Sequence, residues 1–152
     1  MNNKLFCAAV LLAAGAAVSA PVYSQAKPDV LVKQRQAAMV LQGKYYGPLN
    51  AMAQGKLPYD QKIVVRNAGY LDVLSRLAWD GFAPNTKGEK SAALPAVFTD
   101  TAKFTHLQDQ FQAESAKLVQ VSKSGDEASV KNQILAVGKA CAACHDDFRE
   151  KR

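Results

Sequence analysis

The chain has 152 residues, of which 49% are hydrophobic and 21% are charged, and its formal net charge is +6. That length suits one domain and excludes a large two-domain enzyme. The hydrophobic fraction is too high for an intrinsically disordered chain. Three cysteines are too few for a dense disulfide scaffold, and two histidines leave little for a His-rich metal enzyme.

The first residues predict a secretory signal peptide over residues 1–26. Lys4 precedes an uncharged run over residues 5–18, and small residues follow as far as the predicted cleavage site after Ala26. The mature domain is then expected to span residues 27–152. The alternative is an uncleaved membrane anchor, but the segment is rich in Ala and Gly and is broken by Pro21.

Cleavage would change the inventory of charged and metal-binding side chains. It would remove Lys4 and Cys7, which leaves 18 basic and 13 acidic residues, a net charge of +5, and two cysteines. A positive protein attracts partners with acidic docking faces. An exported chain with scattered lysines is not expected to bind nucleic acid, and no stable membrane span is expected after cleavage.

The rest of the chain predicts helices, because its apolar residues recur at helical spacing and no alternating strand pattern is present. Four helices are expected, over about 28–54, 60–79, 99–122 and from a capping box at 124–127 almost to Arg152. Pro48 should bend the first helix or end its regular part, and Asp60 should cap the second. Four helices with short connections indicate an all-α, antiparallel four-helix bundle.

The fourth predicted helix carries Cys141-Ala-Ala-Cys144-His145, a C-x-x-C-H pattern typical of covalent haem c attachment. The two thiols bond the two vinyl groups of one porphyrin, and the histidine, on the same helix face, ligates the iron. A redox C-x-x-C would instead open a helix after a strand. A zinc site needs four ligands, and only His106 and carboxylates remain to complete one.

The C-terminal segment 141–151, which contains this motif, resembles that of class II cytochromes c. Segments 32–43, 57–60 and 102–104 are also similar to that family, so the resemblance covers the whole mature chain. The family contains the cytochromes c′ and their low-spin relatives. The resemblance implies a four-helix bundle, one covalent haem c with its iron, and a bacterial periplasmic location.

The sixth iron position separates the two branches of this family. In the low-spin relatives a methionine four residues before a glycine of the first helix binds the iron, and the resemblance matches Met39, before Gly43, to it. We therefore expect the low-spin branch, a periplasmic electron carrier with iron ligands His145 and Met39, and not an enzyme. The alternative is a five-coordinate cytochrome c′ that binds NO or other small gases, with Met39 only covering the iron.

Two arginines are further candidates for haem contacts. Arg149 follows His145 by four residues, and the resemblance places it beside the imidazole or a haem propionate; an exposed pair with Asp146 is the alternative. Arg35 is expected to face the haem edge. The resemblance also implies a possible homodimer formed through the first two helices, and periplasmic redox proteins as partners.

Overall fold

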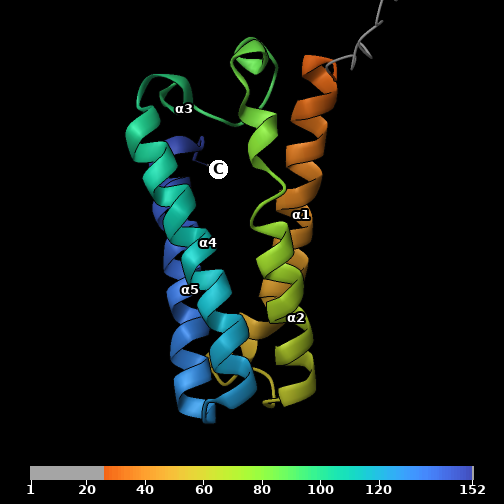
Figure 1. Ribbon diagram of the computed structural model, residues 1–152, viewed down its shortest axis with the longest axis vertical. Coiled ribbons are helices and arrows are strands. Elements are labelled where there is room, and N and C mark those ends of the chain that lie inside the picture. Colours follow the sequence, from red (N-terminus) through yellow and green to blue (C-terminus); the bar gives the residue numbers. More distant parts are fainter. Residues whose placement is uncertain (1–25, 152) are drawn as a thin grey trace, which may run out of the picture.

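Four long helices run along the molecule, and residues 26–151 are described by the computed structural model (Figure 1). The long helices are α1 (Pro28–Ala53), α2 (Gln61–Leu74), α4 (Thr101–Ser124) and α5 (Glu127–Phe148). Short elements connect α2 to α4: η1 (Trp79–Phe82), η2 (Pro84–Thr86) and α3 (Ala96–Thr99). Apart from Ala26, the predicted signal peptide lies outside the described residues, and so does Cys7.

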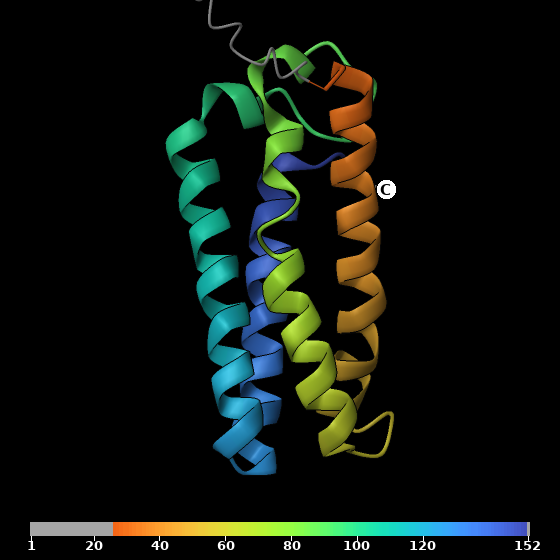
Figure 2. The ribbon, with the colours of Figure 1, turned by 45° about the vertical axis from the view of Figure 1, so that its right-hand side comes forward.

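The helices form an antiparallel bundle, as the sequence predicted. Each long helix packs against two others, in the order α1, α2, α4, α5 and back to α1, and successive helices run in opposite directions (Figures 1 and 2). The short elements between α2 and α4 lie at the end of the bundle where α1 begins and α5 ends. Between residues 26 and 151, no helix has both the length and the apolar character needed to span a membrane.

The hydrophobic core has two parts along the bundle axis. The larger part lies around fully buried side chains of all four long helices, such as Leu49, Val64, Leu118 and Ile134. The smaller part is built on Phe104 and the side chains around it, and lies beneath the connecting segment between α2 and α4. At the level of Trp79, which packs against both parts, the bundle widens into the cavity described below.

Local signals explain where α1 begins and ends and where α2 begins. Pro28 is the first residue of α1, where its missing N–H has no helical partner to lose. Pro48 lies inside α1, which continues to Ala53, and Gly55 turns the chain with a φ of 71°. Asp60 caps α2 as predicted, because its carboxylate accepts hydrogen bonds from the N–H groups of Lys62 (2.8 Å) and Ile63 (3.1 Å).

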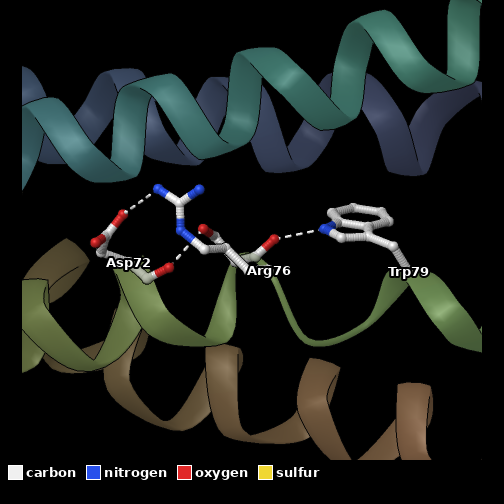
Figure 3. Close-up of polar contacts among 4 residues, drawn as sticks. Asp72, Arg76 and Trp79 are labelled. Atoms are coloured by element: carbon white, nitrogen blue, oxygen red, sulfur yellow. Dashed lines mark hydrogen bonds and ion pairs between the residues drawn. The ribbon is translucent and has the colours of Figure 1, made fainter.

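Helix α2 ends at Leu74, five residues before the predicted end at Trp79. The amide of Gln42 in α1 donates a hydrogen bond to the Leu74 carbonyl (2.8 Å). The next residue, Ser75, donates its hydroxyl to the Asp72 carbonyl (2.7 Å), and its own carbonyl accepts the indole N–H of Trp79 at 2.6 Å (Figure 3). Side chains therefore satisfy carbonyls that a continuing helix would use, and the chain leaves the helical path.

The remaining two predicted helices also differ from the observed ones at their ends. The third begins at Thr101 rather than at Thr99, because the backbone of Asp100 leaves the helical region and its carboxylate caps α4, and it ends at Ser124. The predicted capping box is wrong: Ser124 is the last residue of α4, and Asp126 caps α5 by accepting from the N–H of Ser129 (2.9 Å). Helix α5 ends at Phe148 rather than near Arg152, since the next residues are extended.

Candidate functional site

A cavity of about 560 Å³ lies between α1 and α5, next to the connecting segment between α2 and α4. That volume falls within the range of about 300–1,000 Å³ that small-molecule and cofactor sites occupy. Its wall is mostly apolar. The apolar side chains that line it include Leu71, Trp79, Phe82, Val97, Phe104 and Phe148.

Helix α5 presents the C-x-x-C-H motif to this cavity. Cys141, Cys144 and His145 all line it, as helical spacing predicts. Both thiols are free and half-buried. Burial and the neighbouring Cys144 raise the pKa of Cys141 to about 11, and burial and Asp147 raise the pKa of Cys144. A redox C-x-x-C lowers the pKa of its thiol, so this environment argues against the redox interpretation.

The environment of His145 favours the neutral imidazole. Burial lowers the pKa of His145, and the positive charge of Arg149 lowers it further, whereas Asp146 acts in the opposite direction. A neutral imidazole has a free ring nitrogen, and this is the form that binds metals. The side chain is half-buried at the cavity wall, so one edge of the ring is accessible from the cavity.

Helix α1 supplies the facing wall through residues spaced three or four apart. Arg35, Met39, Gly43 and Tyr46 all line the cavity, so Met39 and His145 border the same space from two helices. The Met39 side chain is half-buried. A Cβ added at Gly43 would meet no atom within 4 Å, so the cavity beside this helix is open. A larger side chain at Gly43 would project into space that a planar ligand could use.

Arg35 is a buried cation held by neutral groups. Arg35 is only 4% exposed. Its guanidinium donates hydrogen bonds to the Gly81 carbonyl (2.5 Å) and the Ser91 hydroxyl (2.7 Å). It also lies 4.4 Å from the centre of the Phe82 ring. Burial lowers the pKa of Arg35. No carboxylate among the described residues pairs with it, so an anionic group bound in the cavity would provide its missing counter-charge.

Arg149 lies at the rim of the cavity, but for a different reason from the one predicted. It follows the last residue of α5 and is extended, so it does not continue the helix face of His145. Its backbone forms an isolated bridge with Ala93, which ties the C-terminal residues to the connecting segment. It is exposed, and the alternative pair with Asp146 is not among the ion pairs of residues 26–151. His106 is exposed on α4, away from the cavity.

Sequence reasoning missed the aromatic wall of the cavity. Phe104 packs edge-on against Phe82, Phe148 and Trp79, with ring centres 4.9, 5.2 and 5.9 Å apart. Phe104 and Phe148 are buried positions of α4 and α5, where helical spacing indicates the inward face. Trp79 and Phe82 lie in the irregular segment after α2, where no periodicity shows which way a side chain points.

A family model described as "Cytochrome C'" matches residues 30–149. The chain belongs to the cytochrome c′ family. It is 40% identical over 126 residues to cytochrome c′ of Rubrivivax gelatinosus, which covers 82% of this chain and 98% of the relative. These comparisons confirm the family and the haem c cofactor. They do not support the predicted assignment to the low-spin branch.

Solved cytochromes c′ have the same fold. The structure of cytochrome c′ from Shewanella frigidimarina has a TM-score of 0.80 at 29% identity and covers 84% of this chain and all of that chain. A nitric oxide complex of a cytochrome c′ variant from Alcaligenes xylosoxidans has a TM-score of 0.77 at 35% identity, covering 85% of this chain and all of that one. The neighbours therefore agree with the bundle described above.

The residues around the cavity fit a covalently bound haem c. The two thiols lie one helical turn apart on one wall and are not paired with each other. The mostly apolar wall suits a porphyrin, and open space beside Gly43 leaves room for it. The unpaired guanidinium of Arg35 suits a carboxylate at the edge of such a group.

Proposed function

We propose that this chain is an exported haem c protein that binds a small gas, such as NO or CO, at an iron ligated by His145. The observation that carries the proposal is the mostly apolar cavity that Cys141, Cys144 and His145 share with Met39. The family match supports it, and so does the similar Alcaligenes protein, one variant of which was solved as a nitric oxide complex. The protein would act by binding rather than by catalysing a reaction.

Each side chain has a part in this function. The thiols of Cys141 and Cys144 hold the haem through two thioether bonds, and the neutral imidazole of His145 binds the iron. When bound, the haem supplies an open iron position for a gas. The mostly apolar wall of the cavity would exclude water, which favours an uncharged diatomic ligand over a hydrated one. Arg35 and Arg149 provide positive charge at the cavity edge for the haem carboxylates.

Met39 is the residue on which the second candidate function depends. If its thioether binds the iron, the protein is an electron carrier, because two strong ligands keep the iron coordination unchanged between redox states. The observation that favours this function is the position of Met39 on the cavity wall facing α5. The family comparisons favour gas binding, with Met39 covering the open side of the haem as a flexible side chain.

Absorption spectra of the oxidised and reduced protein, with and without CO, test the proposal. Gas binding predicts a high-spin spectrum that CO shifts at micromolar to millimolar concentration. A low-spin spectrum in both redox states, insensitive to CO, would favour the electron carrier. Met39→Ala then decides the role of the thioether: an unchanged spectrum excludes it as a ligand. Met52→Leu is the matched control, because Met52 is buried in the larger core and does not line the cavity.

Export and association complete the proposal. The signal peptide is tested by the N-terminal sequence of the mature protein from the periplasm.

A homodimer through α1 and α2 is supported by exposed apolar side chains on these helices, among them Val40 (71% exposed) and Val73 (58%). Sedimentation of the wild-type protein and of the Val73→Lys variant tests whether this dimer forms. Acidic redox partners remain a prediction from the net positive charge.

A further inference from the structure

Tyr46 separates the haem cavity from a second hollow in the surface. This hollow is a groove between α1 and α5, and its walls include Tyr46, Asn50, Leu135, Gly138 and Ala142. Tyr46 is the one side chain that lines both spaces in the described part of the chain. On α1 it shares a face with Met39 and Gly43, so displacement of its ring would connect the groove with the Met39 side of the cavity.

The Tyr46 ring is held in place weakly. Its hydroxyl lies 3.3 Å from the Asn50 side-chain oxygen and 3.3 Å from the Ile134 carbonyl. Both distances are at the long end for O–H···O bonds, and a phenol has a single proton to donate. The side chain packs against the edge of the larger core but is only half-buried, so its ring has an exposed side toward which it can rotate. A small rearrangement of this kind occurs far faster than unfolding.

Gly138 provides the space that the Tyr46 hydroxyl occupies. A Cβ added at Gly138 would overlap that hydroxyl, so an alanine here forces the tyrosine to move. The overlapping atom is the far end of a side chain rather than backbone, so the bundle can accommodate the change. The closed position of the ring therefore depends on the absence of a side chain on the neighbouring turn of α5.

We propose that Tyr46 is a gate through which a small apolar gas passes between the groove and the haem cavity. This proposal rests on the proposed gas-binding function and adds the route of access. A gate limits the rates of binding and release equally, because the gas crosses the same barrier in both directions. Because Tyr46 also lines the cavity, a direct contact with the bound gas would change the ratio of the two rate constants, whereas a gate changes both by the same factor.

The test uses the reduced holoprotein and CO, with association followed after flash photolysis and dissociation by ligand replacement. Tyr46→Ala should raise both rate constants about tenfold, equivalent to about 1.4 kcal/mol of barrier. Gly138→Ala should change both rates in parallel by at least about threefold through the displaced ring. In the Tyr46→Ala background, Gly138→Ala should have no further effect, because the side chain it displaces is gone.

Two controls match these substitutions. Tyr45→Ala removes the neighbouring tyrosine, whose ring packs against Tyr70 and lines neither space, and should leave both rates unchanged. Gly47→Ala makes the same change as Gly138→Ala at a helical glycine with open space around it. Reduced spectra of all variants must match the wild type, which shows that the haem is attached and ligated normally.

Xenon provides a readout that does not depend on the iron. In xenon-pressurised crystals of the oxidised holoprotein, we expect xenon next to Tyr46 in the groove, and continuous occupancy from groove to cavity in Tyr46→Ala. If the wild type binds no CO, the proposed gas-binding function is wrong, and the xenon positions alone then test whether Tyr46 is a gate. Unchanged CO rates in Tyr46→Ala, or xenon reaching the cavity only by another route, would overturn the gate.

Discussion

Arg35 holds the segment that closes the haem cavity, and its removal should destabilise the fold. The guanidinium makes two hydrogen bonds, to Gly81 and Ser91, and packs on the face of Phe82. Hydrogen bonds from a charged donor contribute about 1.5–3 kcal/mol each, and the cation–π contact about 1 kcal/mol. Burying the charged guanidinium costs several kcal/mol, which opposes these contributions, and Arg35→Ala would remove that cost.

The net loss expected for Arg35→Ala is about 3 kcal/mol, or on the order of 10 °C in Tm for a domain of this size. The Thr86 hydroxyl lies 3.3 Å from the Gly81 carbonyl, but its single proton is better placed for the Ala83 carbonyl at 2.7 Å, so it offsets little of the loss. Arg35→Lys should recover little, since an ammonium cannot reach both acceptors and stack on the ring.

Urea unfolding followed by far-UV circular dichroism measures this loss of stability, and hydrogen exchange shows which amides lose protection. Amides between Gly81 and Ser91 should exchange faster in Arg35→Ala, while those of α4 keep their protection relative to global unfolding. Arg66→Ala is the control, because this exposed arginine bonds only its neighbour Asn67 and should cost under about 0.5 kcal/mol. An Arg35→Ala protein as stable as the wild type would refute the reasoning.

Three further predictions follow from the fold. Asp60→Ala should lower the free energy of unfolding by about 1 kcal/mol in urea titrations, whereas Asp60→Asn should be nearly neutral because an amide oxygen also caps. Ile134→Ala, at a fully buried position, should cost about 2–5 kcal/mol, and Val40→Ala, which is 71% exposed, should change the midpoint little. Burial raises the pKa of Tyr46 to about 12 from 10.0, with the nearby Cys141 adding to it. Unfolded tyrosine loses its proton first, so stability is lost as the pH rises from about 10 to 12, and Tyr46→Phe should lack the last tyrosinate step in an absorbance titration.

The sequence predicted those features whose cause is local. Asp60 was identifiable as a cap because a cap depends on one side chain and the next three N–H groups. The C-x-x-C-H motif was identifiable because its three functional side chains lie within five residues of one helix. The end of α2 could not be predicted, because the Leu74 carbonyl accepts a hydrogen bond from Gln42, 32 residues earlier in the chain, as well as one from the local N–H of Leu77. Local propensity carries no information about such a partner.

The candidate site was predicted only on its two helices. Met39 and His145 were placed on helix faces, and the structure brings both to one cavity. Arg35 was expected at the haem edge, but its burial over Phe82 depends on the path of the connecting segment. Arg149 was given a helical position because its spacing from His145 is four, whereas the pairing of Ala93 with Arg149 draws the chain out of the helix.

The cavity is closed by contacts between segments far apart in the sequence. Helix α5 alone would leave the C-x-x-C-H motif facing water, since one helix has no second wall. The wall is completed where the N–H of Leu94 bonds the Phe148 carbonyl (2.9 Å) and that of Glu150 bonds the Ala92 carbonyl (2.9 Å). Arg35 fixes the other end of the same segment on α1. Changes in length or sequence between residues 79 and 95 would thus change water access to the cavity without altering the motif.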